Sequence, residues 1–271
     1  MNKRFPVSPE FMFQIVSLLV AVIVVHTIYA ALIRPNATAI IEHQRLAIAE
    51  NPDYVAEQSL YVMIKDYEQE ACFILMLWAL AIIAYKSTAA ASQRGLLQRD
   101  LITISEGMRV LPGDARELSR KVESLPPPEQ EGLLPRALLA GLHRFGATRN
   151  VQDVASATQA VCHAEAERLE SELSLIRYIA WAIPSIGFIG TVRGIGQALG
   201  LAHKATEGDI SGVTLNLGVA FNSTLIALLI SIVLMFLVHQ LELLQERYVL
   251  DAEQYCERKL IRHLDSRAVG P

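Results

Sequence analysis

The sequence predicts an all-α integral membrane protein with four transmembrane helices, the last two extended into a cytoplasmic helical region. The first observation is composition: 52% of the 271 residues are hydrophobic and the mean hydropathy is +0.32, which is high for a soluble domain. The second is that four apolar segments approach bilayer length: residues 11–33, 71–85, 178–202 and 213–238. The third is that no proline interrupts residues 151–183 or 213–270, so the third and fourth spans are expected to continue beyond the membrane as long helices.

The first two spans need separate justification. Residues 11–33 carry no formal charge and include one imidazole, His26, which we expect to be structural or interfacial rather than a proton relay. Lys3 and Arg4 precede this apolar core as in a signal peptide, but the core is too long and no small-residue cleavage site follows, so we expect it to be retained. Residues 71–85 are short for a span. Lys86 can snorkel, and residues 87–91 extend the apolar stretch.

Charge sets the expected orientation. Residues 86–177 hold twelve Lys and Arg, whereas residues 34–70 hold three, against seven Asp and Glu. The positive-inside rule therefore places both termini and residues 86–177 in the cytoplasm. The acidic excess of residues 34–70 is expected to be a solvated face, on helices spanning 37–50 and 59–70 that are separated by Asn51, Pro52 and Asp53.

These assignments divide the chain into six parts. The N-terminus and first span (1–33) precede an outward loop (34–70) and the second span (71–88). A cytoplasmic helical domain (89–172) follows, with helices expected over 89–110, 113–125 and 133–145 and an amphipathic helix from 151 to 176. The third and fourth spans occupy 173–239, and a cytoplasmic C-terminal helix occupies 240–271, with apolar residues recurring to Leu264.

Small and polar residues form one stripe on each of the last two spans. A turn containing Gly208 and Asp209 joins these helices, so they are expected to be antiparallel neighbours whose stripes face the same volume. In the third span the stripe consists of Pro184, Gly187, Thr191, Gly194 and Ala198; in the fourth it consists of Asn216, Ala220, Thr224, Ala227 and Ser231, with Asn222 and Ser223 beside it.

Two interpretations of these stripes remain open. Proline inside a helix kinks it, and small residues let helices approach closely; here these are Pro184, Gly187, Gly190, Gly194, Ala220 and Ala227, with a further pair at Gly196 and Gly200. Membrane hydroxyls often bond back to their own helix, so packing alone explains each residue taken singly. Together the matched stripes favour an ion pathway lined by Thr191, Thr224, Asn222, Ser223, Asn216 and Ser231.

The ionisable residues in and near the predicted spans limit the functions that this chain can have alone. No predicted span contains Asp or Glu in its interior, so a conducting pathway needs a carboxylate from a second polypeptide. Arg193 follows Thr191 on a neighbouring face; a structural ion pair, a pair with a partner's acid, anion binding and snorkelling all fit it. His163 and the glutamates near it are expected to be a solvated helix face rather than a metal site. Three scattered cysteines fit neither a disulfide framework nor zinc, and the sequence contains no enzyme motif, so we expect no cofactor and no enzyme.

At these two helices the sequence resembles the MotA/TolQ/ExbB proton-channel family, over about residues 150–260. The pattern Pro-x-x-Gly-Leu-x-Gly-Thr-Val-x-Gly of the TolQ/ExbB branch is matched by Pro184, Gly187, Gly190, Thr191, Val192 and Gly194. The next helix of the family is matched by Ala220, Thr224, Leu228 and Ile232, while Ala227 replaces the usual Gly and Val233 stands at the Pro. Arg193 occupies a position that is usually apolar, and the four-span count is similar to the flagellar branch.

The resemblance implies a homopentamer in the bacterial inner membrane, around a dimer of a single-span partner of the MotB/TolR/ExbD type. That partner would supply the membrane Asp, and residues 34–70 would be periplasmic. Thr191 and Thr224 match the pore-lining hydroxyls of the family, and ion flow would drive rotation in a stator-like motor complex. Protons are the expected ion, with Na⁺ left open. Transport, envelope maintenance, motility and defence remain alternatives for the driven process. A non-conducting membrane scaffold that recruits partners through its cytoplasmic helices is the alternative function.

Overall fold

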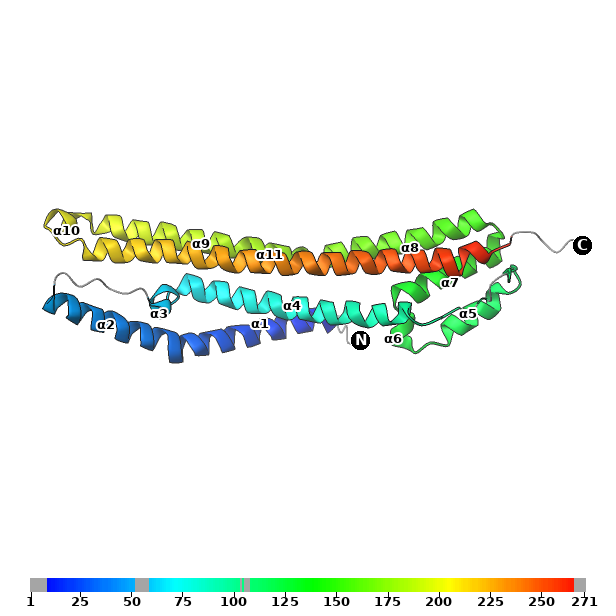
Figure 1. Ribbon diagram of the computed structural model, residues 1–271, viewed down its shortest axis with the longest axis horizontal. Helices are drawn as coiled ribbons and strands as arrows, with labels where there is room; N and C mark the ends of the chain where they lie inside the picture. Colours follow the sequence, from blue (N-terminus) through cyan, green and yellow to red (C-terminus); the bar gives the residue numbers. More distant parts are fainter. Residues whose placement is uncertain (1–8, 52–58, 103, 105–107, 266–271) are drawn as a thin grey trace, which may run out of the picture. The chain divides into compact units, whose positions relative to one another are not determined.

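The computed structural model describes residues 9–51, 59–102, 104 and 108–265, and this part of the chain is helical without a β-strand (Figure 1). Four helical stretches are long and apolar enough to cross a membrane: Pro9–Ile48, Tyr67–Leu97, Val151–Gly200 and Ser211–His263. The prediction of an all-α protein with four helices that can span a membrane is therefore confirmed for the described residues. The chain forms two compact units, one comprising Met1–Ala84 and Leu175–Val238, the other Tyr85–Ser174 and His239–Pro271.

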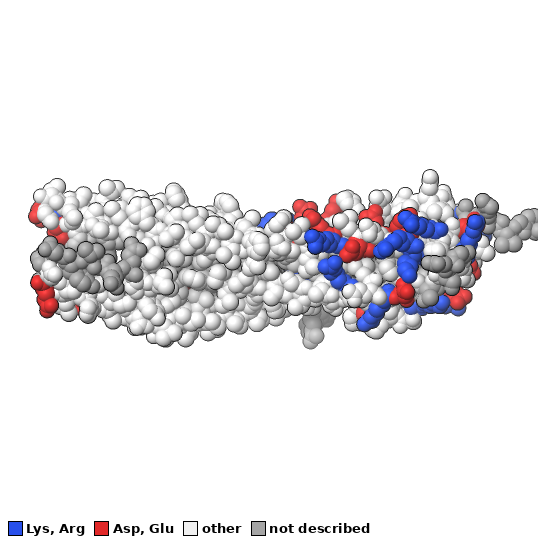
Figure 2. Space-filling model, in the orientation of Figure 1, with Lys and Arg blue, Asp and Glu red and all other residues white. Residues whose placement is uncertain are grey.

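Unit 1 contains the apolar helices. They are α1 (Pro9–Ile28), a π-helical turn (Tyr29–Ile33), α2 (Arg34–Glu50), α3 (Leu60–Met63), most of α4 (Tyr67–Leu97), α9 (Ser174–Gly200), α10 (Ala202–Thr206) and the first part of α11 (Ser211–Lys259). Figure 2 shows almost no charged side chain over unit 1 on the face drawn, except at the end formed by α2 and α10. Lipid excludes unpaired charge, so this surface is what a membrane-embedded unit requires.

The first span continues into α2 without a break, whereas the sequence predicts a separate helix from residue 37. Pro35 has no N–H and its ring would clash with the carbonyl four residues earlier in a regular helix. The backbone widens into a π turn immediately before it, with the Arg34 N–H bonded to the Tyr29 carbonyl. A π turn relieves this clash locally, so the helix continues through Pro35.

The α1 helix packs on α4 through an apolar cluster. Val25, Tyr29 and Ile33 are buried against Phe73 and its neighbours on α4. Nearer the start of α1, the Trp78 indole N–H donates to the Gln14 carbonyl at 2.9 Å.

An antiparallel pair is formed by α9 and α11, which lie side by side in Figure 1 and are joined through α10. The connecting turn uses Gly208 at φ 94°, a conformation that favours glycine. The Asp209 carboxylate then accepts from the backbone N–H of Ser211 at 3.1 Å and from its hydroxyl, which caps the start of α11. These hydrogen bonds lower the pKa of Asp209. The predicted turn and helix pair are both present.

Unit 2 is a helical domain with its own core. It contains α5 (Ala115–Glu123), α6 (Pro127–Gln130), α7 (Leu133–Thr148), α8 (Val151–Glu172), the end of α11 and a 3-10 turn (Ile261–His263). Buried Leu138, Leu142 and Phe145 of α7 pack with Val154 of α8 and Tyr248 of α11 in one apolar cluster. Lys and Arg gather over this unit in Figure 2.

Three further predicted helices differ in extent from the structure. The helix expected over 59–70 is divided, because α3 ends at Met63 and α4 begins at Tyr67. The helix expected over 89–110 ends with α4 at Leu97, because Ile102 enters the core of unit 2 and the Tyr255 hydroxyl accepts from the Leu101 N–H at 3.0 Å. Val110 instead forms an isolated backbone bridge with Leu264. The helix expected to continue from 151 into the third span has a one-residue interruption at Leu173, between α8 and α9.

Candidate functional site

Three glycines of α9 lie directly against α11: Gly187, Gly190 and Gly194. A Cβ atom on Gly187 would come within 2.5 Å of the Ala227 Cβ, and one on Gly190 would come within 2.5 Å of the Ser223 Cβ. A Cβ on Gly194 would meet α11 backbone at 2.7 Å. Real Cβ atoms do not approach so closely, so glycine at these positions lets the two helices touch.

The two small-residue stripes therefore contact each other and do not enclose a common volume as predicted. Ala220 and Ala227 are fully buried in this contact. By contrast, a Cβ on Gly196 or Gly200 would have no neighbour within 4 Å among the described residues, so the second predicted glycine pair makes no close helix contact within this chain.

Thr191 and Thr224 are hydrogen-bonded to each other across the α9–α11 contact, and both are half-buried. The Thr191 hydroxyl also lies 3.2 Å from the Ala220 carbonyl and 3.3 Å from the Gly187 carbonyl. The Thr224 hydroxyl lies 3.1 Å from the same Gly187 carbonyl.

A hydroxyl donates one proton and accepts through two lone pairs. The two threonine hydroxyls thus have two protons to donate, and the acceptors within reach are the two hydroxyl oxygens and the Gly187 and Ala220 carbonyls. The hydrogen bond between the two hydroxyls can therefore be donated by either threonine. In one arrangement, Thr224 donates to Thr191, which donates to a carbonyl; in the other, the Thr191 hydroxyl donates to Thr224, which donates to Gly187. A reorientable hydroxyl pair in an apolar unit can pass a proton or contribute oxygen ligands to a cation.

Ser231 makes a contact that explains the tolerated proline in α9. Pro184 cannot donate to the carbonyl four residues earlier, which belongs to Ala180. The Ser231 hydroxyl of α11 donates to that carbonyl at 3.1 Å. Neighbouring side chains are expected to satisfy such freed backbone groups in membrane helices. The structure thus places Ser231, a predicted pathway residue, in a helix-bridging contact.

The other predicted pathway residues on α11 are Asn216, Ser223 and Asn222, of which the first two share a face. The Asn216 amide donates to its own helix at the Gly212 carbonyl, 2.9 Å away. Ser223 is buried; its hydroxyl donates to the Val219 carbonyl at 2.8 Å and accepts from the Gln69 amide at 3.5 Å. Asn222 is half-buried beside Ser223. Thr191 and Thr224 are thus the two predicted pathway residues that bond to each other.

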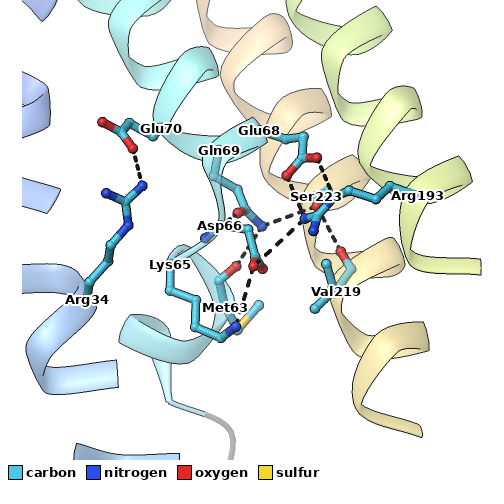
Figure 3. Close-up of polar contacts among 10 residues, drawn as sticks. All are labelled: Arg34, Met63, Lys65, Asp66, Glu68, Gln69, Glu70, Arg193, Val219 and Ser223. Atoms are coloured by element: carbon cyan, nitrogen blue, oxygen red, sulfur yellow. Dashed lines mark hydrogen bonds and ion pairs between the residues drawn. The ribbon is translucent and has the colours of Figure 1, made fainter. Parts of the chain in front are cut away.

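A cluster of charges surrounds the start of α4 (Figure 3). The Arg193 guanidinium of α9 reaches the Glu68 carboxylate through two parallel contacts, Nε to Oε1 at 2.6 Å and Nη2 to Oε2 at 2.8 Å. Asp66 lies 3.9 Å from the same guanidinium. Parallel two-point contacts of this kind are the strongest arginine–carboxylate geometry. Arg193 thus forms an ion pair within its own chain.

Glu70 points away from Glu68 and is engaged by other residues (Figure 3). Its carboxylate is paired with Arg34 and lies 2.7 Å from the His26 Nδ1. The Glu70 side chain is 8% exposed, whereas His26 is 62% exposed. The expectation that the acidic residues before the second span form a solvated face is therefore wrong for Glu68 and Glu70, because basic side chains of α9 and α2 draw them into unit 1.

The sequence contains a signal for this cluster, but it is divided between segments that lie far apart in the chain. Arg193 is the one charged residue in the third predicted span, and a buried cation requires a counter-ion. Glu68 and Glu70 lie immediately before the second span, at the depth where the outer end of the third is expected. Glu70 and His26 are 44 residues apart in sequence, and Glu68 and Arg193 are 125 residues apart. The periodicity of apolar residues within one helix gives no information on such distant contacts.

Among the described residues, no group of three or more His, Cys, Asp or Glu side chains is placed so that it could hold a metal ion. His163 and Glu167 are exposed, as expected for a solvated helix face. Glu165 differs, since it is buried and paired with Arg136 at 3.1 Å and Arg168 at 3.2 Å. The free thiols Cys72, Cys162 and Cys256 are buried.

Comparison with known proteins bears on the segment that contains this site. Residues 129–254 match the MotA/TolQ/ExbB proton channel family, which confirms the resemblance seen in the sequence. The matched segment includes α9, α10 and most of α11, and hence both threonines. No curated protein and no solved structure matches the chain.

Proposed function

We propose, from the match of residues 129–254 to the MotA/TolQ/ExbB proton channel family, that this multi-pass membrane protein is an ion-channel subunit of a rotary, stator-like motor. The single observation that carries the proposal is the hydrogen-bonded pair Thr191–Thr224, which lies in the apolar unit and inside the matched segment. Protons are the transported ion that we propose. The energy of their flow across the bacterial inner membrane would drive mechanical work.

The hydroxyl pair has the chemistry that a pathway needs. Because both side chains are half-buried, part of each remains accessible at the edge of the α9–α11 contact. An ion or a water chain moving along this edge would meet two oxygens whose direction of donation can reverse. Since small residues close the α9–α11 contact itself, the opposite side of the pathway must come from another chain.

The acid that carries the ion is proposed to come from that second chain. Glu68 and Glu70 of unit 1 are already engaged by Arg193 and Arg34. A dimer of single-span chains of the MotB/TolR/ExbD type, each with one membrane Asp, would supply a titratable carboxylate. We propose that five copies of the present chain surround it.

For orientation in the membrane, we propose that both termini and unit 2 are cytoplasmic. Of the six predicted parts of the chain, the cytoplasmic ones are the N-terminus, residues 89–172 and residues 240–271. The basic residues of unit 2 support this orientation through the positive-inside rule. The short Gly208–Asp209 turn and α2 would then face the periplasm, and the third and fourth spans, 173–239, would form the channel core.

Flux measurement with matched variants tests the proposal. The chain would be co-purified with its single-span partner, reconstituted into liposomes that contain a pH-sensitive dye, and driven by a potassium diffusion potential. We expect Thr191→Val and Thr224→Val to preserve assembly and to abolish proton flux. Thr27→Val is the control, because Thr27 is exposed on α1 and its hydroxyl bonds to its own helix at the Ile23 carbonyl. Normal flux through both test variants would show the proposal to be wrong.

A non-conducting membrane scaffold is the second candidate, favoured by the tight packing of the glycine stripe on α11. In that case the polar groups serve helix association, and unit 2 recruits partners. The scaffold predicts no flux in the wild-type complex and no single-span Asp-bearing chain among the co-purified proteins. The same liposome assay therefore separates the two functions.

A further inference from the structure

We propose that Glu68 is the counter-ion that makes the Thr191–Thr224 site passable to cations, by cancelling the charge of Arg193. This inference rests on the proposed ion-channel function and adds a specificity-determining residue to it. Arg193 follows Thr191 by two residues on α9, so the two side chains leave different faces of the helix within one turn, and the charge of the guanidinium acts on the hydroxyl pair over a distance rather than by contact. An uncompensated positive charge beside a pathway repels protons and metal cations alike.

The contact geometry fits a dedicated counter-ion. Glu68 engages Arg193 through two hydrogen bonds of 2.6 and 2.8 Å, which fix both groups in one plane. The Glu68 side chain is 12% exposed and Arg193 is 36% exposed. The Glu68 Cγ lies 3.3 Å from the position that a Cβ on Gly190 would take. Glycine at this position therefore lets the carboxylate lie directly against α9.

The first turn of α4 is fixed independently of the ion pair. The Gln69 amide donates to the Met63 carbonyl at 2.9 Å, and its oxygen accepts from the Asp66 N–H at 2.9 Å. The same amide approaches the Ser223 hydroxyl of α11 (Figure 3). Because these contacts hold α4 in place, Glu68 is already positioned for Arg193 and the cancellation of charge requires no rearrangement.

Neighbouring acids are poor substitutes for Glu68. Asp66 lies 3.9 Å from Arg193 but is also 3.4 Å from the Lys65 ammonium. Glu70 is committed to Arg34 and His26. Removing the carboxylate of Glu68 would therefore leave a net positive charge within one helical turn of Thr191. The partner's Asp would then experience the field of Arg193 as well as that of the transported ion.

Three variants separate charge cancellation from a merely structural clamp: Glu68→Gln, Arg193→Gln, and the double variant. Proton flux is measured in liposomes with the complete complex, and assembly is measured by co-purification. We expect Glu68→Gln to lower flux about tenfold, as estimated for an unpaired charge about 10 Å from the path at an effective dielectric constant of about 20. Arg193→Gln should still conduct, and the double variant should recover flux to within about threefold of Arg193→Gln, since it again has no net charge at this position. Glu42→Gln, an exposed position on α2, is the matched control and should conduct as wild type.

Each outcome bears on the proposal. Wild-type flux in Glu68→Gln overturns it, and so does a double variant that assembles but stays as defective as Glu68→Gln, which is what a structural clamp predicts. If Glu68→Gln does not assemble, the exchanged pair Glu68→Arg with Arg193→Glu provides the test. We expect its flux to be within about threefold of wild type. Loss of flux in an assembled complex of the exchanged pair would contradict the proposal. Wild-type complex that conducts nothing refutes the proposed function instead. Normal flux in Glu68→Gln alongside loss of flux in Thr191→Val refutes only the role of Glu68.

Discussion

The Ser231 hydroxyl of α11 donates to the Ala180 carbonyl of α9 at 3.1 Å, and that carbonyl is the acceptor that Pro184 leaves without its usual helical donor. One side chain thus compensates for a proline on the neighbouring helix. The contact also joins the two helices of the candidate site. A residue selected from the sequence as a pathway hydroxyl has, in the structure, a clear role in helix association.

Replacing Ser231 by Ala should therefore destabilise the α9–α11 pair by about 1–2 kcal/mol, since it removes the hydroxyl donor of a carbonyl in an apolar unit. In a Pro184→Ala background the residue 184 N–H can satisfy Ala180, so the cost of Ser231→Ala should fall to a few tenths of a kcal/mol. Unfolding of the purified protein in detergent, followed by circular dichroism, measures the coupling.

Ser185→Ala is the control for this cycle, because the Ser185 hydroxyl is exposed and bonds to its own helix at the Trp181 carbonyl. It should have the same small effect in both backgrounds. Equal costs of Ser231→Ala with and without Pro184 would contradict the compensation.

Adding a methyl group at Gly190 should separate α9 from α11. The new Cβ would lie 2.5 Å from the Ser223 Cβ and 2.7 Å from its hydroxyl oxygen, and backbone has to shift to relieve this overlap. We expect Gly190→Ala to cost about 2–3 kcal/mol of unfolding free energy. Gly196→Ala is the matched change, because its Cβ meets no described atom within 4 Å, and helix propensity should make it neutral or stabilising by up to about 1 kcal/mol. Similar melting temperatures for the two variants would show that the close contact is absent in solution.

Removing the charge of Glu172 should destabilise unit 2. Glu172 lies 2.8 Å from the ammonium of Lys86, whose side chain is only 5% exposed, and loss of an ion pair that includes a buried charge is costly. We expect Glu172→Gln to lower the unfolding free energy by about 1–3 kcal/mol. Glu167→Gln removes an equivalent charge from the exposed pair with His163 on the same helix and should change it by less than about 0.5 kcal/mol. Thermal unfolding of both variants at neutral pH provides the comparison, and equal shifts would contradict a stabilising role for the Lys86–Glu172 pair.

Deleting the Tyr248 hydroxyl should loosen the start of α7. The hydroxyl oxygen accepts from the Leu133 N–H at 3.2 Å, and Leu133 is fully buried. An unsatisfied buried N–H costs about 1–3 kcal/mol, so Tyr248→Phe should destabilise unit 2 by that order. Hydrogen exchange at the first turn of α7 should accelerate. Tyr67→Phe, at an exposed tyrosine whose ring still lies under Arg34, should leave stability unchanged. Unchanged exchange at α7 in Tyr248→Phe would count against this hydrogen bond.

Much of the fold could be predicted from local patterns. Hydropathy over about twenty residues reports a span directly, because lipid selects for apolar surface over a fixed length. The Gly208 turn and the small stripes similarly predicted that α9 and α11 are antiparallel neighbours. The prediction of a helix through residue 110 was wrong because the hydrogen-bond partner of Leu101 is the distant Tyr255, and local periodicity contains no information on such a partner.

By itself, the sequence determined the class of the protein, the four apolar spans and the two faces that bring Thr191 and Thr224 together, since each depends on spacing within a helix or across a short turn. Only the tertiary structure decided what those faces do. It showed that the two stripes pack directly against each other and that Ser231 donates to the carbonyl that Pro184 leaves without a helical donor. It also showed that Glu68 pairs with Arg193 and that Glu70 pairs with Arg34. The physical reason is that charges and freed carbonyls in an apolar surrounding must find partners wherever the fold provides them, and those partners lie far away in sequence.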